Sequence, residues 1–303
     1  MSHAEANIPR SGVARPAAAP TTDDATTSYA TRERTAHRRR RNSRAIRWSI
    51  QLAIVVAFLL CWQYLPTIGF LSSHVRIFDR FYISSPSQVW KTLGDLAVGR
   101  DNTPLVWSYL WTTVSATLIG CAIGLVLGAI FGLLFSNFRP LNAVLRPFVV
   151  LLNSVPRVAL IPLFVLLVGP TVKASTLSVT AVVFFLGFFN AYEGGVGVQQ
   201  AVLDNVQLLG ASRLQVMRYV RLPAVATWTF AAIPNAISFG LVIAVTTELF
   251  AGIQGMGYIL LTSTSNVESS LTFAIIVVLS IVGLLMYFLA TFSRSRVLHW
   301  QGK

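Results

Sequence analysis

The sequence predicts an all-α protein that crosses a membrane several times, and three observations lead to this prediction. The 303-residue chain is 54% hydrophobic but only 12% charged, whereas soluble domains carry about 25% charged residues. Apolar runs of about 18 residues or more recur, and each can cross a hydrocarbon core of roughly 30 Å as a helix. The runs also lack the short alternating segments that are typical of a membrane β-barrel.

Residues 1–46 differ in composition from the rest of the chain. They are rich in Ala, Thr, Ser, Pro and Arg and contain almost no large apolar side chain, so they cannot bury enough surface to offset the entropy of ordering. We expect a disordered basic tail. Its densest charge run, residues 37–41, favours retention in the cytoplasm and attraction to anionic lipid headgroups. The run lacks interleaved aromatic residues, which argues against nucleic-acid binding.

The remainder, residues 47–303, is predicted to be one transmembrane domain. Its six apolar segments are residues 47–70, 105–135, 141–169, 174–191, 227–250 and 271–292. An even number of spans places both termini on the same side. Most of the 24 Lys and Arg residues fall in segments that this topology puts on the side of the termini, so both termini are predicted to be cytoplasmic.

Glycines in the second predicted span recur every four residues. Gly120, Gly124, Gly128 and Gly132 therefore share one face of a helix, where a neighbouring backbone can approach closely. The pattern predicts tight packing against another helix, in this chain or in a second copy.

Prolines indicate two further features. A short helix is expected to begin near Pro86, since proline suits the first turn of a helix, and to lie on the outer surface. The third span contains Pro147, Pro156 and Pro162, each of which removes a backbone donor and kinks a helix.

Polar side chains inside the predicted spans are candidates to line a transport pathway, because charges within a membrane are costly and usually functional. The candidates are Arg157, Asn190, Asn235, Ser238 and Glu248. Two of them have alternative interpretations. The guanidinium of Arg157 could reach the cytoplasmic headgroups, and Glu248 could lie at the outer surface.

The segment 198–223 is predicted to form an amphipathic helical hairpin in the cytoplasm. Gly210 is expected to end its first helix. Ser212, with Gln215 three residues later, has the spacing of a capping box that starts a second helix. Pro223 either ends that helix or starts the next one. Such a hairpin rests on lipid or docks in a groove of a partner, and the residues alone leave both interpretations open.

Motifs for catalysis are not found in this sequence. It has no Gly-x-x-x-x-Gly-Lys-[Ser/Thr] segment for nucleotide phosphates, and its four histidines are scattered, so no metal-ligand cluster is predicted. Both cysteines lie in apolar runs, where they are expected to pack as small hydrophobes. We therefore expect the chain to be no enzyme and to bind no cofactor itself.

The hairpin resembles the cytoplasmic loop of permease subunits of ATP-binding-cassette (ABC) importers that work with a binding protein. The motif of that family is Glu-Ala-Ala, three residues, Gly, nine residues, Ile, one residue and Leu-Pro. Gly210, Val220 and Leu222-Pro223 stand at the matching distances. The departure is at residues 204–206, where Asp-Asn-Val replaces Glu-Ala-Ala.

Other segments share this resemblance, which extends from about Trp48 to the C-terminus. They are residues 84–89, residues 156–163 and Glu248 together with residues 255–258. The pattern is nearest the branch of the family that imports sulfonates, taurine, nitrate or thiamine precursors.

The resemblance implies a type I importer permease fold with six transmembrane helices, in which the hairpin is a coupling helix that contacts an ATPase. It assigns this contact to seven residues, Asp204, Gly210, Ala211, Ser212, Arg213, Leu222 and Pro223. The implied partners are a dimer of ATPase subunits that bind ATP and Mg, a periplasmic or lipoprotein substrate-binding protein, a second permease copy and membrane lipids, but no nucleic acid.

The implied location is the bacterial cytoplasmic (inner) membrane, and the implied cargo is a small anion or a thiamine precursor. Two rival hypotheses remain. An ion-coupled secondary transporter would use Arg157 and Glu248 as a pair, and a membrane scaffold would transport nothing.

Overall fold

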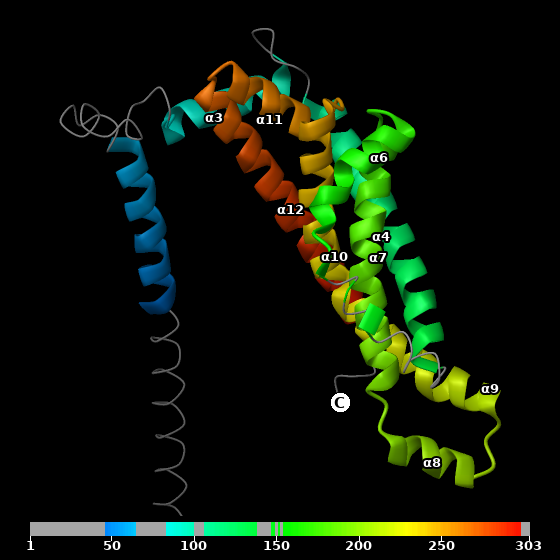
Figure 1. Ribbon diagram of the computed structural model, residues 1–303. Helices are drawn as coiled ribbons and strands as arrows, with labels where there is room; N and C mark the ends of the chain where they lie inside the picture. The colour runs from blue at the N-terminus through cyan, green and yellow to red at the C-terminus, as the bar shows by residue number, and fades with distance from the viewer. Residues whose placement is uncertain are drawn as a thin grey trace, which may run out of the picture. The chain divides into compact units, whose positions relative to one another are not determined.

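The computed structural model describes residues 46–64, 83–99, 106–137, 147–148, 151 and 154–297, and its regular elements in these ranges are all helices (Figure 1). The all-α prediction is thereby confirmed. The chain separates into two units, Met1–Cys61 and Trp62–Lys303. The predicted disordered tail lies outside the described residues except for its last residue.

The first unit contributes most of an apolar helix, Ile46–Tyr64. None of the residues in the most hydrophobic stretch of this helix is buried by the described part of the chain. Its outward-facing side chains, such as Leu52 and Phe58, are suited to hydrocarbon. Residues 65–70 of the first predicted span lie outside the described residues.

Four long helices form the body of the second unit. They are α4 (Val106–Asn137), α7 (Val172–Val196), α10 (Leu222–Ala251) and α12 (Ser269–Val297). Together with the N-terminal helix, they make five helices in the described ranges that are long and apolar enough to cross a membrane. Residues from all four helices meet in one buried apolar cluster that includes Cys121, Val183, Ala244 and Met286.

The four glycines of α4 pack against α7 of the same chain. A Cβ atom on Gly128 would lie 2.6 Å from both the carbonyl oxygen of Phe184 and the backbone nitrogen of Phe188. One on Gly124 would lie 2.8 Å from the carbonyl oxygen of Thr180. Since these contacts are with backbone atoms, no side chain can rotate to make room, and α4 and α7 depend on glycine for their close approach.

A second apolar cluster lies at one end of this unit. It joins α3 (Pro86–Val98) and α11 (Met256–Ser265) to α4 and α12 through residues that include Val89, Leu96 and Ile275. The short helix predicted at Pro86 is present, with the proline in its first turn. In Figure 1, α3 and α11 lie at one end of the unit, whereas α8 (Gln200–Leu208) and α9 (Arg213–Val216) lie at the other.

The third predicted span, residues 141–169, was expected to be kinked by its prolines, and its described part is broken beside two of them. Its described part contains a 3₁₀ turn, η3 (Arg157–Leu160), followed by α6 (Ile161–Val168). Together they form one short apolar helical stretch, Arg157–Val168, and residues 141–146, 149, 150, 152 and 153 of this segment lie outside the described residues. Pro156 immediately precedes the turn, and Pro162 lies in the first turn of α6; because proline cannot donate a backbone hydrogen bond, both favour a break here.

The fifth predicted span, residues 227–250, lies within a longer helix that begins in the hairpin. The helix is continuous from Arg213 to Ala251, a length of 39 residues. It comprises α9, a π-helical segment η4 (Met217–Arg221) and α10. The second half of the hairpin therefore runs directly into the long apolar helix, and Pro223 lies at the start of α10.

Candidate functional site

The hairpin turns at Gly210, at the end of α8. Gly210 has a φ of 83°, which is the left-handed conformation that glycine adopts without steric cost. Its N–H donates to the carbonyl oxygen of Gln207, and the N–H of Ala211 donates to that of Val206. These two bonds form a Schellman motif, which satisfies carbonyl groups left free at a helix end.

The second half of the hairpin begins at the predicted capping box. The N–H of Gln215 donates to Oγ of Ser212 over 3.3 Å, and the N–H of Ser212 donates to Oε1 of Gln215 over 2.7 Å. Both ends of the turn are thus fixed by local hydrogen bonds. The turn is a defined structure and can present its side chains in one arrangement.

Several large apolar side chains of the hairpin are uncovered. Leu208 and Leu209 are each 86% exposed, and Leu214 is 76% exposed. Near them, the carboxylate of Asp204 accepts a hydrogen bond from Gln200. A cluster of exposed large apolar side chains beside a charge is typical of a surface that another protein covers.

The Leu-Pro pair at the start of α10 explains the π-helical segment. Pro223 has no N–H, and in a regular α-helix its ring would clash with the carbonyl group of Tyr219, four residues earlier. The chain avoids this clash by a wider turn, in which the N–H of Leu222 donates to the carbonyl oxygen of Met217, five residues earlier. Wide turns of this kind recur at functional sites in helices.

Arg157 lies beside the middle of α7. Its guanidinium carbon is 5.6 Å from the ring centroid of Phe185, and Phe185 is near the midpoint of Val172–Val196. A cation over an aromatic face is attracted by the ring. This contact places the guanidinium beside the central part of α7.

The other polar candidates form no single cluster with it. Asn190 in α7 donates to the carbonyl oxygen of Leu186, and Ser238 in α10 donates to that of Pro234. Asn235 and Ser238 lie on an exposed face of α10. Because an uncovered asparagine is unfavourable in hydrocarbon, this face is suited to contact with water or with another protein.

Glu248 lies inside the helix bundle and not at its surface. Its side chain is completely buried, so the alternative at the outer surface is wrong, and it does not share the exposed face of Asn235. Its Oε2 accepts hydrogen bonds from Thr113 Oγ1 and from the N–H of Gly257.

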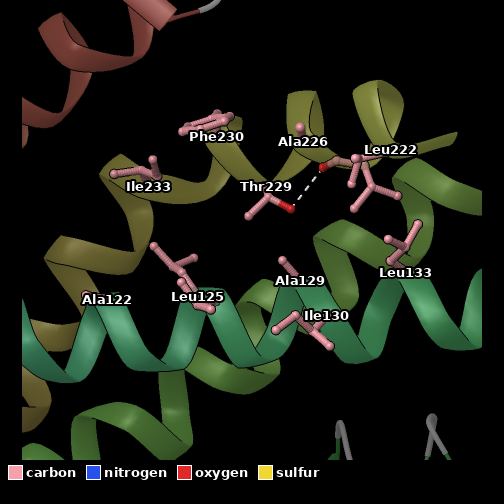
Figure 2. A pocket seen from close by; sticks show the side chains of 12 residues that line it. Ala122, Leu125, Ala129, Ile130, Leu133, Leu222, Ala226, Thr229, Phe230 and Ile233 are labelled. Atoms are coloured by element: carbon pink, nitrogen blue, oxygen red, sulfur yellow. Dashed lines mark hydrogen bonds between the residues drawn. The ribbon is translucent and has the colours of Figure 1, made fainter. Parts of the chain in front are cut away.

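An apolar groove of about 380 Å³ lies between α4 and α10 (Figure 2). Its lining includes Leu125, Ile130 and Phe230. The hydroxyl group of Thr229 faces the groove but donates to the carbonyl oxygen of Val225. The described lining therefore offers no charged partner to a polar cargo, and the groove is not a candidate for the polar part of the pathway.

Several helices long and apolar enough to cross a membrane, a few polar side chains within them and an uncovered hairpin at one end of the unit are typical of a multi-spanning transport protein. Residues 124–299 match the family described as binding-protein-dependent transport system inner membrane component. This match includes more than half of the chain, and the protein belongs to that family. The membership predicted from the hairpin motif is confirmed.

Several known proteins are similar over much of their length. A probable ABC transporter permease of Haemophilus influenzae is 28% identical over 78% of this chain and 91% of its own. The riboflavin transport system permease RibX of Chloroflexus aurantiacus is 26% identical over 74% and 82%. The taurine transport system permease TauC of Escherichia coli is 26% identical over 54% and 59%.

The fold is similar to that of a solved structure of the MetNI methionine ABC transporter in an inward-facing conformation. The TM-score is 0.56 at 19% sequence identity, over 64% of this chain and 96% of that chain. This likeness supports the predicted type I importer permease fold.

Proposed function

We propose that this chain is the membrane subunit of an ABC importer, that it forms the translocation pathway with a second permease, and that a separate ATPase drives it through the hairpin. The observation that carries the proposal is the continuity of the hairpin with α10. Force applied at Leu214 would reach the membrane along a single helix, Arg213–Ala251. Alternation between inward- and outward-open states would then be a rigid-body movement of the kind known in transporters.

The exposed surface of the hairpin favours docking to a protein over contact with lipid. Each helix has one buried apolar anchor, Leu203 in α8 and Val216 in α9, whereas Leu208 and Leu214 are exposed. A short helix with apolar anchors fits a groove in a partner. The ATPase subunit would supply that groove and would bind ATP and Mg, because the sequence of this chain has no motif for them.

The proposed topology has the hairpin and both termini in the cytoplasm of a bacterium and α3 and α11 on the outer side. A periplasmic or lipoprotein binding protein would deliver cargo on that outer side. The excess of basic residues in the segments near the hairpin and the termini supports this orientation.

For the cargo we propose a small anion, such as a sulfonate, taurine or nitrate. Arg157 at the depth of the centre of α7 would attract a negative group in a low-dielectric region. The similarity to TauC agrees with this class. The similarity to RibX makes riboflavin the cargo to test against it.

Two experiments test the proposal. The tagged chain is purified from its own membranes, and an ATPase subunit is expected to copurify in equimolar amount. The complex is then reconstituted with its binding protein, and uptake is expected to require ATP and Mg. Uptake that a proton gradient drives without ATP would establish the secondary transporter instead, and uptake that is unchanged by deletion of the chain would establish the scaffold.

The cargo is tested by uptake of taurine, an alkanesulfonate, nitrate and riboflavin in the same proteoliposomes. Arg157→Leu is expected to lower uptake of the anion by about tenfold or more, and Arg157→Lys to retain part of it, since the charge remains. Equal uptake by all three proteins would remove Arg157 from the pathway.

A further inference from the structure

Arg221, at the junction of the hairpin and the membrane helix, connects this junction to the end of α4. Its Nη1 donates to Oδ1 of Asn137 over 2.6 Å and to the carbonyl oxygen of Ser136 over 3.3 Å. Asn137 is the last residue of α4, and Arg221 is the last residue of η4. Two elements that are 84 residues apart in the chain are thus joined at the end of the unit that carries the hairpin.

A cation is favoured at this place for a general reason. The last carbonyl groups of a helix have no partner within the helix, and they give the C-terminal end a partial negative charge that attracts Arg and Lys. Hydrogen bonds from a guanidinium are also roughly twice as strong as those between neutral groups. Arg221 therefore stabilises the end of α4 by both charge and hydrogen bonding.

The end of α4 is itself fixed against α7. Ser136 is buried, and a Cβ atom on Gly195 would lie 2.5 Å from its Cβ. Ser136 therefore occupies the space that a side chain at position 195 would need. Because Ser136 packs directly on Gly195, the end of α4 cannot move at this point unless α7 moves with it.

The π-helical segment sets which residue faces α4. One extra residue in a turn rotates all preceding residues by about 100° relative to the helix that follows. The wide turn is a consequence of Pro223, which follows Arg221 by two residues. The Leu-Pro pair and the arginine are in this way parts of one arrangement.

We propose that Arg221 is a positioning residue through which movement of the hairpin is transmitted to α4 as well as to α10. The covalent helix carries the movement into α10, and the bonds from Arg221 to Ser136 and Asn137 carry it into α4. Through the packing of Ser136 on Gly195, α7 moves with them. This inference rests on the proposed function of the hairpin as the element that the ATPase drives.

The test measures ATP hydrolysed per cargo molecule imported, in proteoliposomes that contain the complete transporter. Arg221→Ala and Asn137→Ala are each expected to raise this ratio by roughly two- to tenfold while the ATPase subunit still copurifies. Arg221→Lys should recover part of the coupling, since it keeps the charge but not the planar donor geometry. Arg296→Ala, a change at the end of α12, is the control and should leave the ratio unchanged.

The double variant Arg221→Ala/Asn137→Ala should be no worse than the more affected single variant, because both changes remove the same contact. A wild-type ratio in Asn137→Ala and Arg221→Lys overturns the inference, even if Arg221→Ala fails to assemble. If the wild-type chain itself does not copurify with an ATPase, the proposed function fails instead, so the two failures are distinguishable.

Discussion

The hydroxyl group of Thr113 in α4 donates a 2.8 Å hydrogen bond to Oε2 of Glu248 in α10, at a place where both side chains are completely buried. The same hydroxyl oxygen accepts the N–H of Met256, and Oε2 also accepts the N–H of Gly257. These are the first two N–H groups of α11, which have no partner within their own helix. Two side chains from distant parts of the chain thus cap a third helix.

Glycines at the start of α11 allow its backbone to approach the carboxyl group of Glu248. A Cβ atom on Gly255 would overlap the carboxyl group of Glu248, and one on Gly257 would overlap the carbonyl oxygen of Val245. The Gly-Met-Gly sequence therefore lets the start of α11 lie directly on the carboxyl group. We interpret Glu248 as a residue that holds α11 to the bundle.

The first prediction concerns this cap. Thr113→Val should release α11, because the N–H of Met256 would lose its acceptor and a buried donor without a partner costs about 1–3 kcal/mol. Glu248→Ala should do the same through Gly257, whereas Glu248→Gln keeps an acceptor oxygen and should be milder. Hydrogen exchange of Met256–Ser265 measures the effect, and unchanged protection in both Thr113→Val and Glu248→Ala would contradict it.

The second prediction concerns the contact of α4 with α7. Gly128→Ala should destabilise the bundle by about 1–3 kcal/mol, because the added methyl group meets backbone atoms that cannot move aside. Gly94→Ala in α3 is the matched control, since a Cβ atom there has no neighbour within 4 Å in the described structure. Thermal unfolding in detergent should show a lower midpoint for Gly128→Ala only; equal midpoints would mean that the helices can separate without cost.

The third prediction concerns the turn of the hairpin. Gly210→Pro should uncouple ATP hydrolysis from uptake, because proline requires a φ near −65° and removes the N–H that Gln207 accepts. Gly210→Asn should retain most coupling, since asparagine tolerates the left-handed conformation. The ratio of ATP hydrolysed to cargo imported distinguishes them. Coupled transport by the proline variant would show that the hairpin is not the transmission element.

The fourth prediction concerns charge on the same hairpin. Asp204 is exposed, and its hydrogen bond to Gln200 is also at the surface, so its replacement should not affect the fold. Asp204→Lys is expected to weaken the association with the ATPase and Asp204→Glu to preserve it, because charge pairs at an interface set partner recognition. Titration of the purified subunits measures the affinity, and equal affinities would place Asp204 outside the interface.

Much of the fold could be predicted because membrane helices depend on local properties. Apolar length predicted the helices in α4, α7, α10 and α12. The four-residue period of the glycines predicted a close helix neighbour, although not that the neighbour is α7. In the hairpin, the glycine turn and the capping box involve residues only a few positions apart, so composition and spacing sufficed to predict them.

Other features depended on contacts between residues that are distant in the chain. The sequence assigned no role to Arg221, and no local signal indicated that Asn137 would accept a hydrogen bond from it. It also left Glu248 between a pathway and a surface location. A carboxyl group looks the same in a sequence whether it faces water or the N–H groups of another helix, and the environment decides between them.

What the sequence by itself determined is therefore the helical class, the turn at Gly210 and the family to which the chain belongs. The tertiary structure decided that the hairpin is continuous with α10, that α4 packs on α7, and that Glu248 is a buried cap for α11. The physical reason is the range of the interactions. Hydrophobicity and capping act within a few residues, whereas burial and hydrogen bonding of a polar side chain depend on which helices the fold brings together.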